Sequence, residues 1–307
     1  MYNLLMNEIV RHGDKAALFP IHHLQDLKRD VEGLKANAEL NSFQQFIVND
    51  LYHLDEPQDF GARSILIVAS PQPSLLRLFF TLEGKRIQAL LPASYADKNR
   101  SHLRVEDYLR ACLAANGRHI QYAPRLPHKL SAVHSGLARY GRNNITFVEG
   151  FGSFLNLNTF FTDIACPEDP WREIRAMDAC THCQACQKAC PTGAIIAERF
   201  LIDNQRCLTY FNEAGGEYEF PAWMDPGVHH TLYGCLRCQM ICPQNQPYLA
   251  REGGTIEFDA AETAILMQGK PLECLPEGLR LKVDGLEMAE YLSGIPRNLR
   301  SLAAKTD

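Results

Sequence analysis

The residues in this sequence that are best suited to chemistry are cysteines at regular spacing. The run C-T-H-C-Q-A-C-Q-K-A-C-P contains Cys180, Cys183, Cys186 and Cys190, and a proline follows the fourth cysteine. Thiolates at this pitch hold a cubane [4Fe–4S] cluster, and where two clusters are present the fourth cysteine ligates the other one. The spacing therefore predicts one cluster here and a partner motif elsewhere in the chain.

The partner motif is C-L-R-C-Q-M-I-C-P, which begins at Cys235, and Cys207 lies between the two runs. Crossed ligation divides these cysteines into two sets of four. The first cluster is expected to be held by Cys180, Cys183, Cys186 and Cys242, and the second by Cys190, Cys207, Cys235 and Cys238.

Zinc sites and disulfide frameworks also use closely spaced cysteines. Structural zinc rarely takes the C-x-x-C-x-x-C-x-x-x-C-P arrangement, and a disulfide scaffold would not place eight of eleven cysteines in one third of a long chain. The pattern therefore favours two iron–sulfur clusters. Cys112, Cys166 and Cys274 lie outside the motifs, and we assign them no chemistry.

Length and composition are those of a globular protein. A chain of 307 residues predicts two or three packed units, and 46% hydrophobic with 22% charged residues is ordinary. No apolar run approaches the ~18 residues of a spanning helix, and the N-terminus lacks a basic segment followed by an apolar core. Cluster-binding thiolates also suit a reducing compartment. We expect a cytoplasmic protein without membrane contact.

The charge is slightly acidic, with a formal net value of −5. A dedicated nucleic-acid binder usually carries a basic excess, because phosphate contacts supply most of its affinity. Local basic stretches at 125–142 and 297–300 are more typical of a solvated face or an anionic cofactor than of an RNA site. RNA binding is the less favoured interpretation and stays open.

Hydrophobic patterning predicts mixed helices and strands. The apolar run 64–70 is bounded by turn residues, which indicates a strand buried on both faces. Residues 75–82 and 86–91 predict a β-hairpin. The other expected helices cover 1–11, 24–31, 42–51, 105–116, 129–140, 261–267 and 286–304, and the other expected strands cover 16–20, 119–122 and 145–149.

These elements predict three parts. An α/β domain is expected over residues 1–165, a double-cluster domain over 166–250, and a short helical region over 251–307. The stretch 167–170 contains two prolines and is expected to be a linker. The long insertion between Cys207 and Cys235 is absent from compact ferredoxins, so this domain is expected to be built around another surface.

Several stretches resemble the epoxyqueuosine reductase family, which is related to the reductive dehalogenases. The resemblance covers roughly residues 60–250 and rests on 61–68, 135–145, 151–163, 180–195, 206–210 and 234–245. It implies an α+β fold. An N-terminal α/β corrinoid-binding domain, similar to nitroreductases and reductive dehalogenases, would be followed by a two-cluster ferredoxin-like domain and a short helical C-terminal region.

The resemblance also implies a base-off cobalamin that receives electrons through the clusters from a ferredoxin or flavodoxin. The reduced corrinoid would then reduce a small-molecule or tRNA-borne substrate. The residues implied in corrinoid binding are Gly136, Arg139, Gly141, Arg142, Gly152 and Ser153. The glycines have a simpler interpretation as turns and helix caps. His128 and His134 could contact the corrinoid or the substrate, or could be simple surface residues.

The sequence departs from the family at its proton donor. The family carries an aspartate shortly before the glycine-rich segment, whereas here no carboxylate lies between Asp107 and Glu149. Gln121 or Tyr122 takes the position of the acid, depending on a one-residue gap. Tyr122 is expected to replace it as the catalytic proton donor, with Arg125, His128 or Lys129 as the basic neighbour that lowers its pKa. A tyrosine that closes a strand can also serve packing alone.

We therefore expect a cobalamin-dependent iron–sulfur reductase. The alternative is an electron-transfer protein or reductive activator that serves a partner corrinoid protein and has no substrate of its own, and loss of the aspartate fits that alternative. A third hypothesis is a cobalamin-binding or trafficking module.

Overall fold

The computed structural model describes residues 1–55, 57, 59–196 and 201–304. The chain forms two compact units, each assembled from two separate stretches. The first comprises Met1–Gln72 and Asn99–Cys183, and the second comprises Pro73–Lys98 and Gln184–Asp307.

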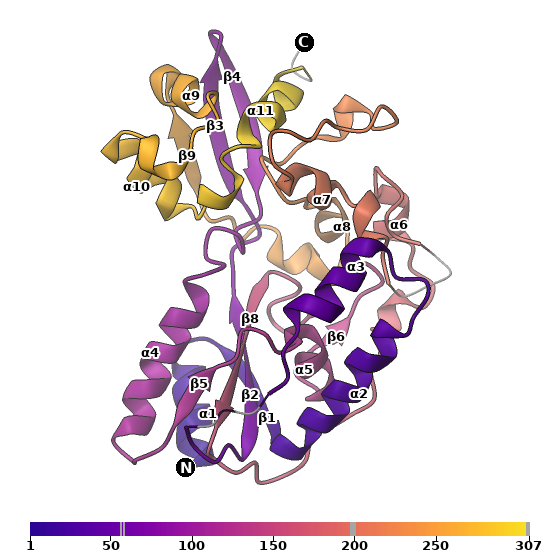
Figure 1. Cartoon of the computed structure of the whole chain (residues 1–307), viewed down its shortest axis with the longest axis vertical. Coiled ribbons are helices and arrows are strands. Elements are labelled where there is room, and N and C mark those ends of the chain that lie inside the picture. The colour runs from indigo at the N-terminus through magenta and orange to yellow at the C-terminus, as the bar shows by residue number, and fades with distance from the viewer. Residues whose placement is uncertain (56, 58, 197–200, 305–307) are drawn as a thin grey trace. The chain divides into compact units, whose positions relative to one another are not determined.

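The first unit is a four-stranded antiparallel sheet between two layers of helices (Figure 1). Its strands follow the order β1-β2-β8-β5. The elements are α1 (Tyr2–Arg11), β1 (Lys15–Pro20), α2 (Leu24–Lys35), α3 (Ser42–Phe46), β2 (Ser64–Pro71), α4 (Ser101–Ala114), β5 (Ile120–Tyr122), α5 (His128–His134), β6 (Arg139–Tyr140), β7 (Thr146–Phe147) and β8 (Leu155–Thr162).

Strand β2 lies inside this sheet and is buried on both faces, as its apolar run predicts. Alternate side chains point to opposite faces of a strand. Leu66 and Val68 accordingly pack in a core with α1 and α4, while Ile65 and Ile67 pack in a second core with α2 and α5. The sheet therefore provides a rigid base for the loops at its edges.

The predicted helix 129–140 is wrong in its second half. Helix α5 ends at His134, Gly136 has a φ of +74°, and Arg139–Tyr140 forms the short strand β6, which pairs with β7. A positive φ is readily adopted by glycine and breaks the helix. The glycine-rich segment is therefore a turn followed by a two-stranded ribbon.

The second unit contains the sheet β4-β3-β9, with β3 and β4 antiparallel and β9 parallel to β3. Its helices and strands are β3 (Leu76–Leu82), β4 (Lys85–Leu91), α6 (Ala185–Ala189), α7 (Leu208–Glu213), α8 (Arg237–Met240), β9 (Thr255–Phe258), α9 (Ala260–Leu266), α10 (Glu277–Gly285) and α11 (Ile295–Ala303).

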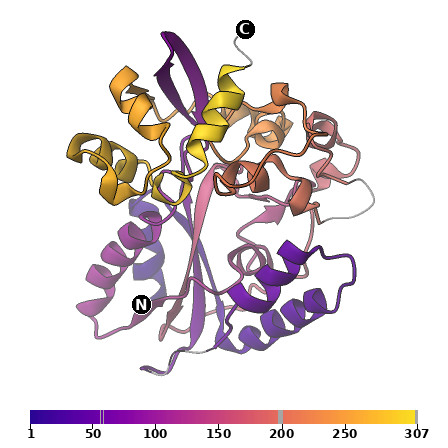
Figure 2. The same ribbon diagram turned by 45° about the horizontal axis from the view of Figure 1, so that its top comes forward.

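The hairpin β3–β4 belongs to this second unit, although in sequence it lies between the two stretches of the first unit (Figure 2). Leu78 and Phe80 on one face of β3 pack in a core with Leu279 of α10 and Leu299 of α11. The division into domains at 165/166 and 250/251 stays a prediction, and the compact units cut the chain at other points.

The C-terminal region also differs from the expectation of helices alone. Its residues 255–258 form β9 beside β3, and the predicted helix 286–304 is replaced by a short turn at Ala289–Tyr291 and the helix α11. Gly294 precedes α11, and Pro296 in its first turn suits a helix start. Within the described ranges, no helix has the length and hydropathy that a membrane crossing requires.

Candidate metal centre

The first cysteine run begins in the first unit, where it is tied to the glycine-rich segment. The Met177 N–H donates to the carbonyl of Tyr140 at 2.8 Å. The Arg142 guanidinium donates from Nη2 to the Cys180 carbonyl at 2.8 Å and from Nε to the Cys183 carbonyl at 3.0 Å. One side chain thus fixes the backbone on both sides of the first C-x-x-C step.

Three cysteines of the predicted second cluster lie close together in the second unit. Cys190 and Cys207 are each near enough to Cys235 to influence its ionisation. Burial raises the pKa of Cys207, and it raises the pKa of Cys235 to about 12. Buried thiolates without a cation are unfavourable, whereas a bound metal stabilises them.

Backbone N–H groups are already directed at these sulfur atoms. Cys207 receives hydrogen bonds from the backbone and side chain of Thr209, and Cys235 receives one from the backbone N–H of Arg237. Both contacts lower the thiol pKa against the effect of burial. Hydrogen bonds to ligand sulfurs also tune the reduction potential of iron–sulfur clusters.

All eleven cysteines are free thiols. The N–H donors directed at the sulfur atoms of Cys207 and Cys235 fit a cluster that binds through sulfur, and thiols without disulfide bonds do not fit a disulfide framework. Of the eight motif cysteines, Cys180 and Cys183 belong to the first unit and the other six to the second.

A histidine that sequence reasoning missed lies beside the second set. His230 Nε2 is 4.0 Å from the Cys235 sulfur and accepts a hydrogen bond from the Leu236 N–H at 3.3 Å. Its Nδ1 donates to the Val228 carbonyl at 3.1 Å, so the proton is assigned to Nδ1. His230 lies in the insertion between Cys207 and Cys235, where no spacing rule identifies it.

A half-buried acid, Glu213, also lies near this set. The Tyr95 hydroxyl donates to the carboxylate of Glu213, and burial raises the pKa of Glu213. The charge of Glu213 raises the pKa of Cys207, and Cys207 in turn raises the pKa of Tyr95. Gly234, with a φ of +67°, packs against Tyr95 and Pro92, and a Cβ there would lie 3.0 Å from Pro92. Glycine is therefore required directly before Cys235.

The residues implied in corrinoid binding all lie in the first unit, and their close contacts are within the chain. A Cβ at Gly136 would lie 3.0 Å from Arg172, and one at Gly141 would lie 2.7 Å from Phe147. Gly152 has a φ of +64° in a turn that closes on Val148. These contacts explain glycine at the three positions without a macrocycle.

The polar members of this set are placed differently. Arg139 is exposed and lies 3.6 Å from Asp178, and Arg142 holds the first cysteine run. Ser153 is buried. The structure does not test corrinoid binding by any of these residues, which stays a prediction.

Tyr122 lies on β5 and packs on the α4 side of the sheet. Its ring stacks on His102 with ring centroids 4.1 Å apart. Its ring centroid lies 5.4 Å from that of Phe160. Burial raises the pKa of Tyr122, and the carboxylate of Glu106 raises it further. The expected lowering of this pKa by a basic neighbour is therefore wrong in direction.

The three proposed basic neighbours are engaged elsewhere. Arg125 Nη2 donates to the Asp50 carbonyl at 2.7 Å, and Lys129 Nζ donates to the Asn144 carbonyl at 3.1 Å. His128 Nδ1 lies 2.5 Å from Thr159 Oγ1, and burial lowers the pKa of His128 to about 4. His134 is buried rather than a surface residue, and its Nε2 contacts Asp30.

The fold and the cysteine site together define a double-cluster iron–sulfur protein. Residues 179–245, which include all eight motif cysteines, match the family described as 4Fe–4S double cluster binding domain. The chain is similar in sequence to epoxyqueuosine reductases. The enzyme of Pseudomonas aeruginosa is 33% identical over 180 residues, which make up 55% of this chain and 46% of that protein. The enzyme of Escherichia coli is 34% identical over 151 residues, or 48% of this chain and 38% of that protein.

The fold is that of solved epoxyqueuosine reductases. The structure from Streptococcus thermophilus matches 100% of this chain and 81% of that chain, with a TM-score of 0.61 and 16% identity. The structure from Bacillus subtilis matches 99% of this chain and 82% of that chain, with a TM-score of 0.62 and 20% identity. The chain spans about half the length of the curated relatives that it matches, or less.

Proposed function

We propose that this chain is an oxidoreductase in which two [4Fe–4S] clusters deliver electrons to a corrinoid that reduces a bound substrate. The observation that carries this proposal is the proximity of Cys190, Cys207 and Cys235, with N–H donors directed at the sulfur atoms of Cys207 and Cys235. A [4Fe–4S] cluster in such an environment is a one-electron carrier whose potential depends on burial and on hydrogen bonds to sulfur.

When bound, the corrinoid would supply a strongly reducing metal centre, while the protein orients the substrate, excludes water and donates a proton. The shared fold supports a corrinoid, because the resemblance to epoxyqueuosine reductases implies one. Gly136 and Gly141 do not support it independently, since side chains of this chain already occupy the space beside them.

We propose epoxyqueuosine in tRNA as the first substrate to test. Curated relatives carry the name epoxyqueuosine reductase, and one solved structure of that enzyme contains an epoxyqueuosine-modified tRNA stem loop. The acidic net charge of this chain makes a small electrophile the second substrate class to test. A ferredoxin or flavodoxin is the proposed electron donor, in the cytoplasm.

A specific observation favours the alternative function. Tyr122 is a weaker acid than a free tyrosine, because burial and Glu106 raise its pKa, and no carboxylate replaces the family aspartate nearby in sequence. A protein without an effective proton donor could pass electrons to a partner corrinoid protein without reducing a substrate itself.

The two functions are separated by a turnover assay. Cluster-loaded protein is incubated anaerobically with cobalamin, a chemical reductant and an epoxyqueuosine-modified stem loop, and the nucleoside is analysed by mass spectrometry. Loss of one oxygen atom from the nucleoside is expected for the reductase. Full reduction of the clusters with an unchanged nucleoside, followed by the same result with small epoxides and halides, would support the electron-transfer alternative.

A further inference from the structure

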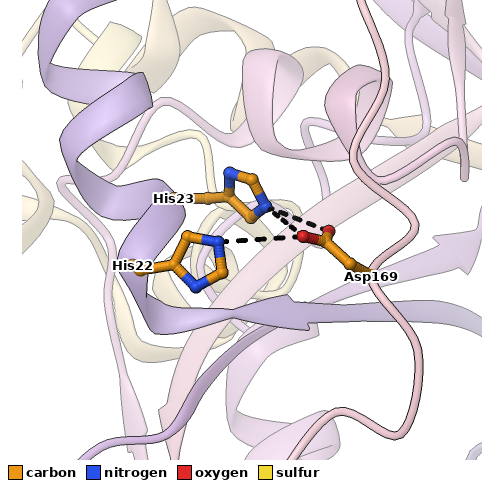
Figure 3. Close-up of side chains that lie close together, drawn as sticks. All are labelled: His22, His23 and Asp169. Carbon is orange, nitrogen blue, oxygen red and sulfur yellow. Dashed lines mark hydrogen bonds and ion pairs between the residues drawn. The ribbon is translucent and has the colours of Figure 1, made fainter.

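Two adjacent histidines and one aspartate meet in the first unit (Figure 3). His22 and His23 form a short turn between β1 and α2, and Asp169 lies in the segment that leads from β8 to the first cysteine run. One ligand atom from each residue lies within 4.8 Å of the other two.

Both imidazoles direct their Nε2 atoms at the carboxylate of Asp169. His23 Nε2 lies 2.8 Å from Asp169 Oδ2 and 3.0 Å from Oδ1, and His22 Nε2 lies 3.7 Å from Oδ2. Ligand atoms around a tetrahedral zinc ion with bonds of about 2.0 Å are separated by about 3.3 Å. The observed separations lie on either side of that value, so small side-chain movements would admit an ion.

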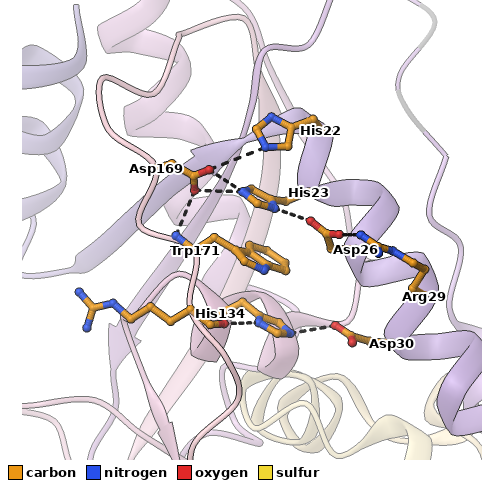
Figure 4. Close-up of polar contacts among 9 residues, drawn as sticks. His22, His23, Asp26, Arg29, Asp30, His134, Asp169 and Trp171 are labelled. Atoms are coloured by element: carbon orange, nitrogen blue, oxygen red, sulfur yellow. Dashed lines mark hydrogen bonds and ion pairs between the residues drawn. The ribbon is translucent and has the colours of Figure 1, made fainter.

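The second nitrogen of His23 is held by another carboxylate. Its Nδ1 lies 2.5 Å from Asp26 Oδ2, and Arg29 pairs with the other oxygen of Asp26 (Figure 4). A histidine that ligates a metal typically donates its remaining ring N–H to a carboxylate, which fixes the tautomer and raises the basicity of the ligating nitrogen. A proton on Nδ1 leaves the Nε2 lone pair directed at the space beside Asp169.

The site is also rigid. The Trp171 ring stacks on His23 with centroids 4.1 Å apart and on His134 with centroids 4.2 Å apart. The Trp171 backbone N–H donates to Asp169 Oδ1 at 3.1 Å. The ring of His23 and the carboxylate of Asp169 are thus held in place before any ion arrives.

Exposure allows an ion to enter from solvent. The His23 side chain is 9% exposed, whereas His22 and Asp169 are 66% and 45% exposed. Two imidazoles and one carboxylate, with room for water, form the ligand set of an open first-row metal site.

The geometry points to a divalent transition-metal site, of the kind that binds Zn²⁺, formed by His22, His23 and Asp169. Asp26 orients the buried ligand of this site. A bound ion would join the turn after β1 to the segment that leads to the first cysteine run, so we infer a structural role for it.

The test uses the full chain with both clusters intact, and Zn²⁺ as the probe. Zinc binding is measured by isothermal titration calorimetry, and the ligands are identified by zinc K-edge X-ray absorption. Histidine and carboxylate ligands give a shell at about 2.0 Å, whereas cysteine gives one at about 2.3 Å. We expect one equivalent of Zn²⁺ with a nitrogen and oxygen shell and with unchanged iron content.

The variants His22→Ala and Asp169→Asn alter exposed side chains, so the fold should survive both. Each should weaken zinc binding by at least about tenfold, since even loss of a partner beyond the ligands costs about 10–100-fold. The matched control is His119→Ala, which removes a single exposed histidine that lies 3.2 Å from Asp163. This control should bind zinc as the wild type does.

Three results would overturn the inference. These are no zinc uptake, a shell of sulfur alone, or equal zinc affinity in His22→Ala, Asp169→Asn and the wild type. Any of them would leave His23 as a hydrogen-bonded bridge between Asp26 and Asp169, with no metal.

Discussion

The guanidinium of Arg142 lies 2.8 Å from the carbonyl oxygen of Cys180 and ties the glycine-rich segment to the first cysteine run. A second bond from Nε reaches Cys183. Two charge-assisted hydrogen bonds from one planar group are directional, so they fix the backbone from which two predicted cluster ligands project. The order of the first cluster site therefore depends on a residue almost forty positions upstream.

Replacing this arginine should affect the first cluster selectively. In Arg142→Gln the carbonyls of Cys180 and Cys183 lose their shared donor, so we expect first-cluster occupancy to fall while the second cluster stays intact. Iron and sulfide analysis with electron paramagnetic resonance of the reduced protein measures this. Arg139→Gln is the matched control, because its contact with Asp178 is an exposed ion pair of little energy. Equal cluster content in both variants would show that the Arg142 contact is not needed for assembly.

Cys190 tests the crossed ligation. Although Cys190 belongs to the first cysteine run, crossed ligation predicts that it serves the second cluster, and it lies near Cys207 and Cys235. Cys190→Ala should therefore lose or convert the second cluster and retain the first. Cys112→Ala, on α4, should retain both. Loss of the first cluster alone in Cys190→Ala would contradict the assignment.

Substitution of Tyr122 should change the turnover rate and leave the cofactor content unchanged. If it donates the proton, Tyr122→Phe should lower the turnover rate by about 100-fold or more and leave both clusters bound. Because its pKa is raised above 10, the wild-type rate should not fall through neutral pH from ionisation of this group. Tyr52→Phe, at another half-buried tyrosine of the first unit, is the control. Unchanged turnover in Tyr122→Phe would remove this residue from the mechanism.

Because burial favours the neutral form of His128, its protonation should make the protein less stable in mild acid. Its pKa in the folded state is lowered to about 4 by burial, whereas an unfolded histidine has a pKa of about 6.5. Between these pH values the unfolded state binds a proton on His128 that the folded state does not bind. The contribution of neutral His128 to the free energy of unfolding is therefore fully present above about pH 6.5 and is lost as the pH falls towards 4. The loss amounts to a few kcal/mol at most.

Thermal unfolding midpoints measured between pH 4.5 and 7.5 test this effect. In His128→Gln the midpoint should vary less with pH than in the wild type, because the variant has no group to protonate at this position. His53→Gln serves as the control and should retain the wild-type slope. An identical slope in His128→Gln would mean that other groups account for the acid sensitivity.

The sequence was most informative where chemistry imposes a spacing. Cluster ligands must follow a fixed pitch, so the sequence predicts eight cysteine ligands, and the range that matches the double-cluster family contains all eight cysteines. The run 64–70 predicted a doubly buried strand because apolar residues occupy both faces of β2. Both signals are local.

Features that depend on distant contacts were missed. Strand β8 contains the buried Asn158, which looks unfavourable in a strand until its hydrogen bond to Ser101 is seen. His23 and Asp169 are 146 residues apart, so no local pattern joins them. The helix expected over 129–140 failed because the turn at Gly136 outweighed the apolar periodicity.

Binding of a corrinoid is tested by titration with cob(II)alamin. Protein with both clusters intact is titrated anaerobically with cob(II)alamin, and uptake is followed by absorbance and electron paramagnetic resonance. We expect one-to-one binding with a base-off Co(II) signal. Absence of uptake by protein that retains both clusters would contradict it and would leave an iron–sulfur electron-transfer protein whose partner holds the corrinoid.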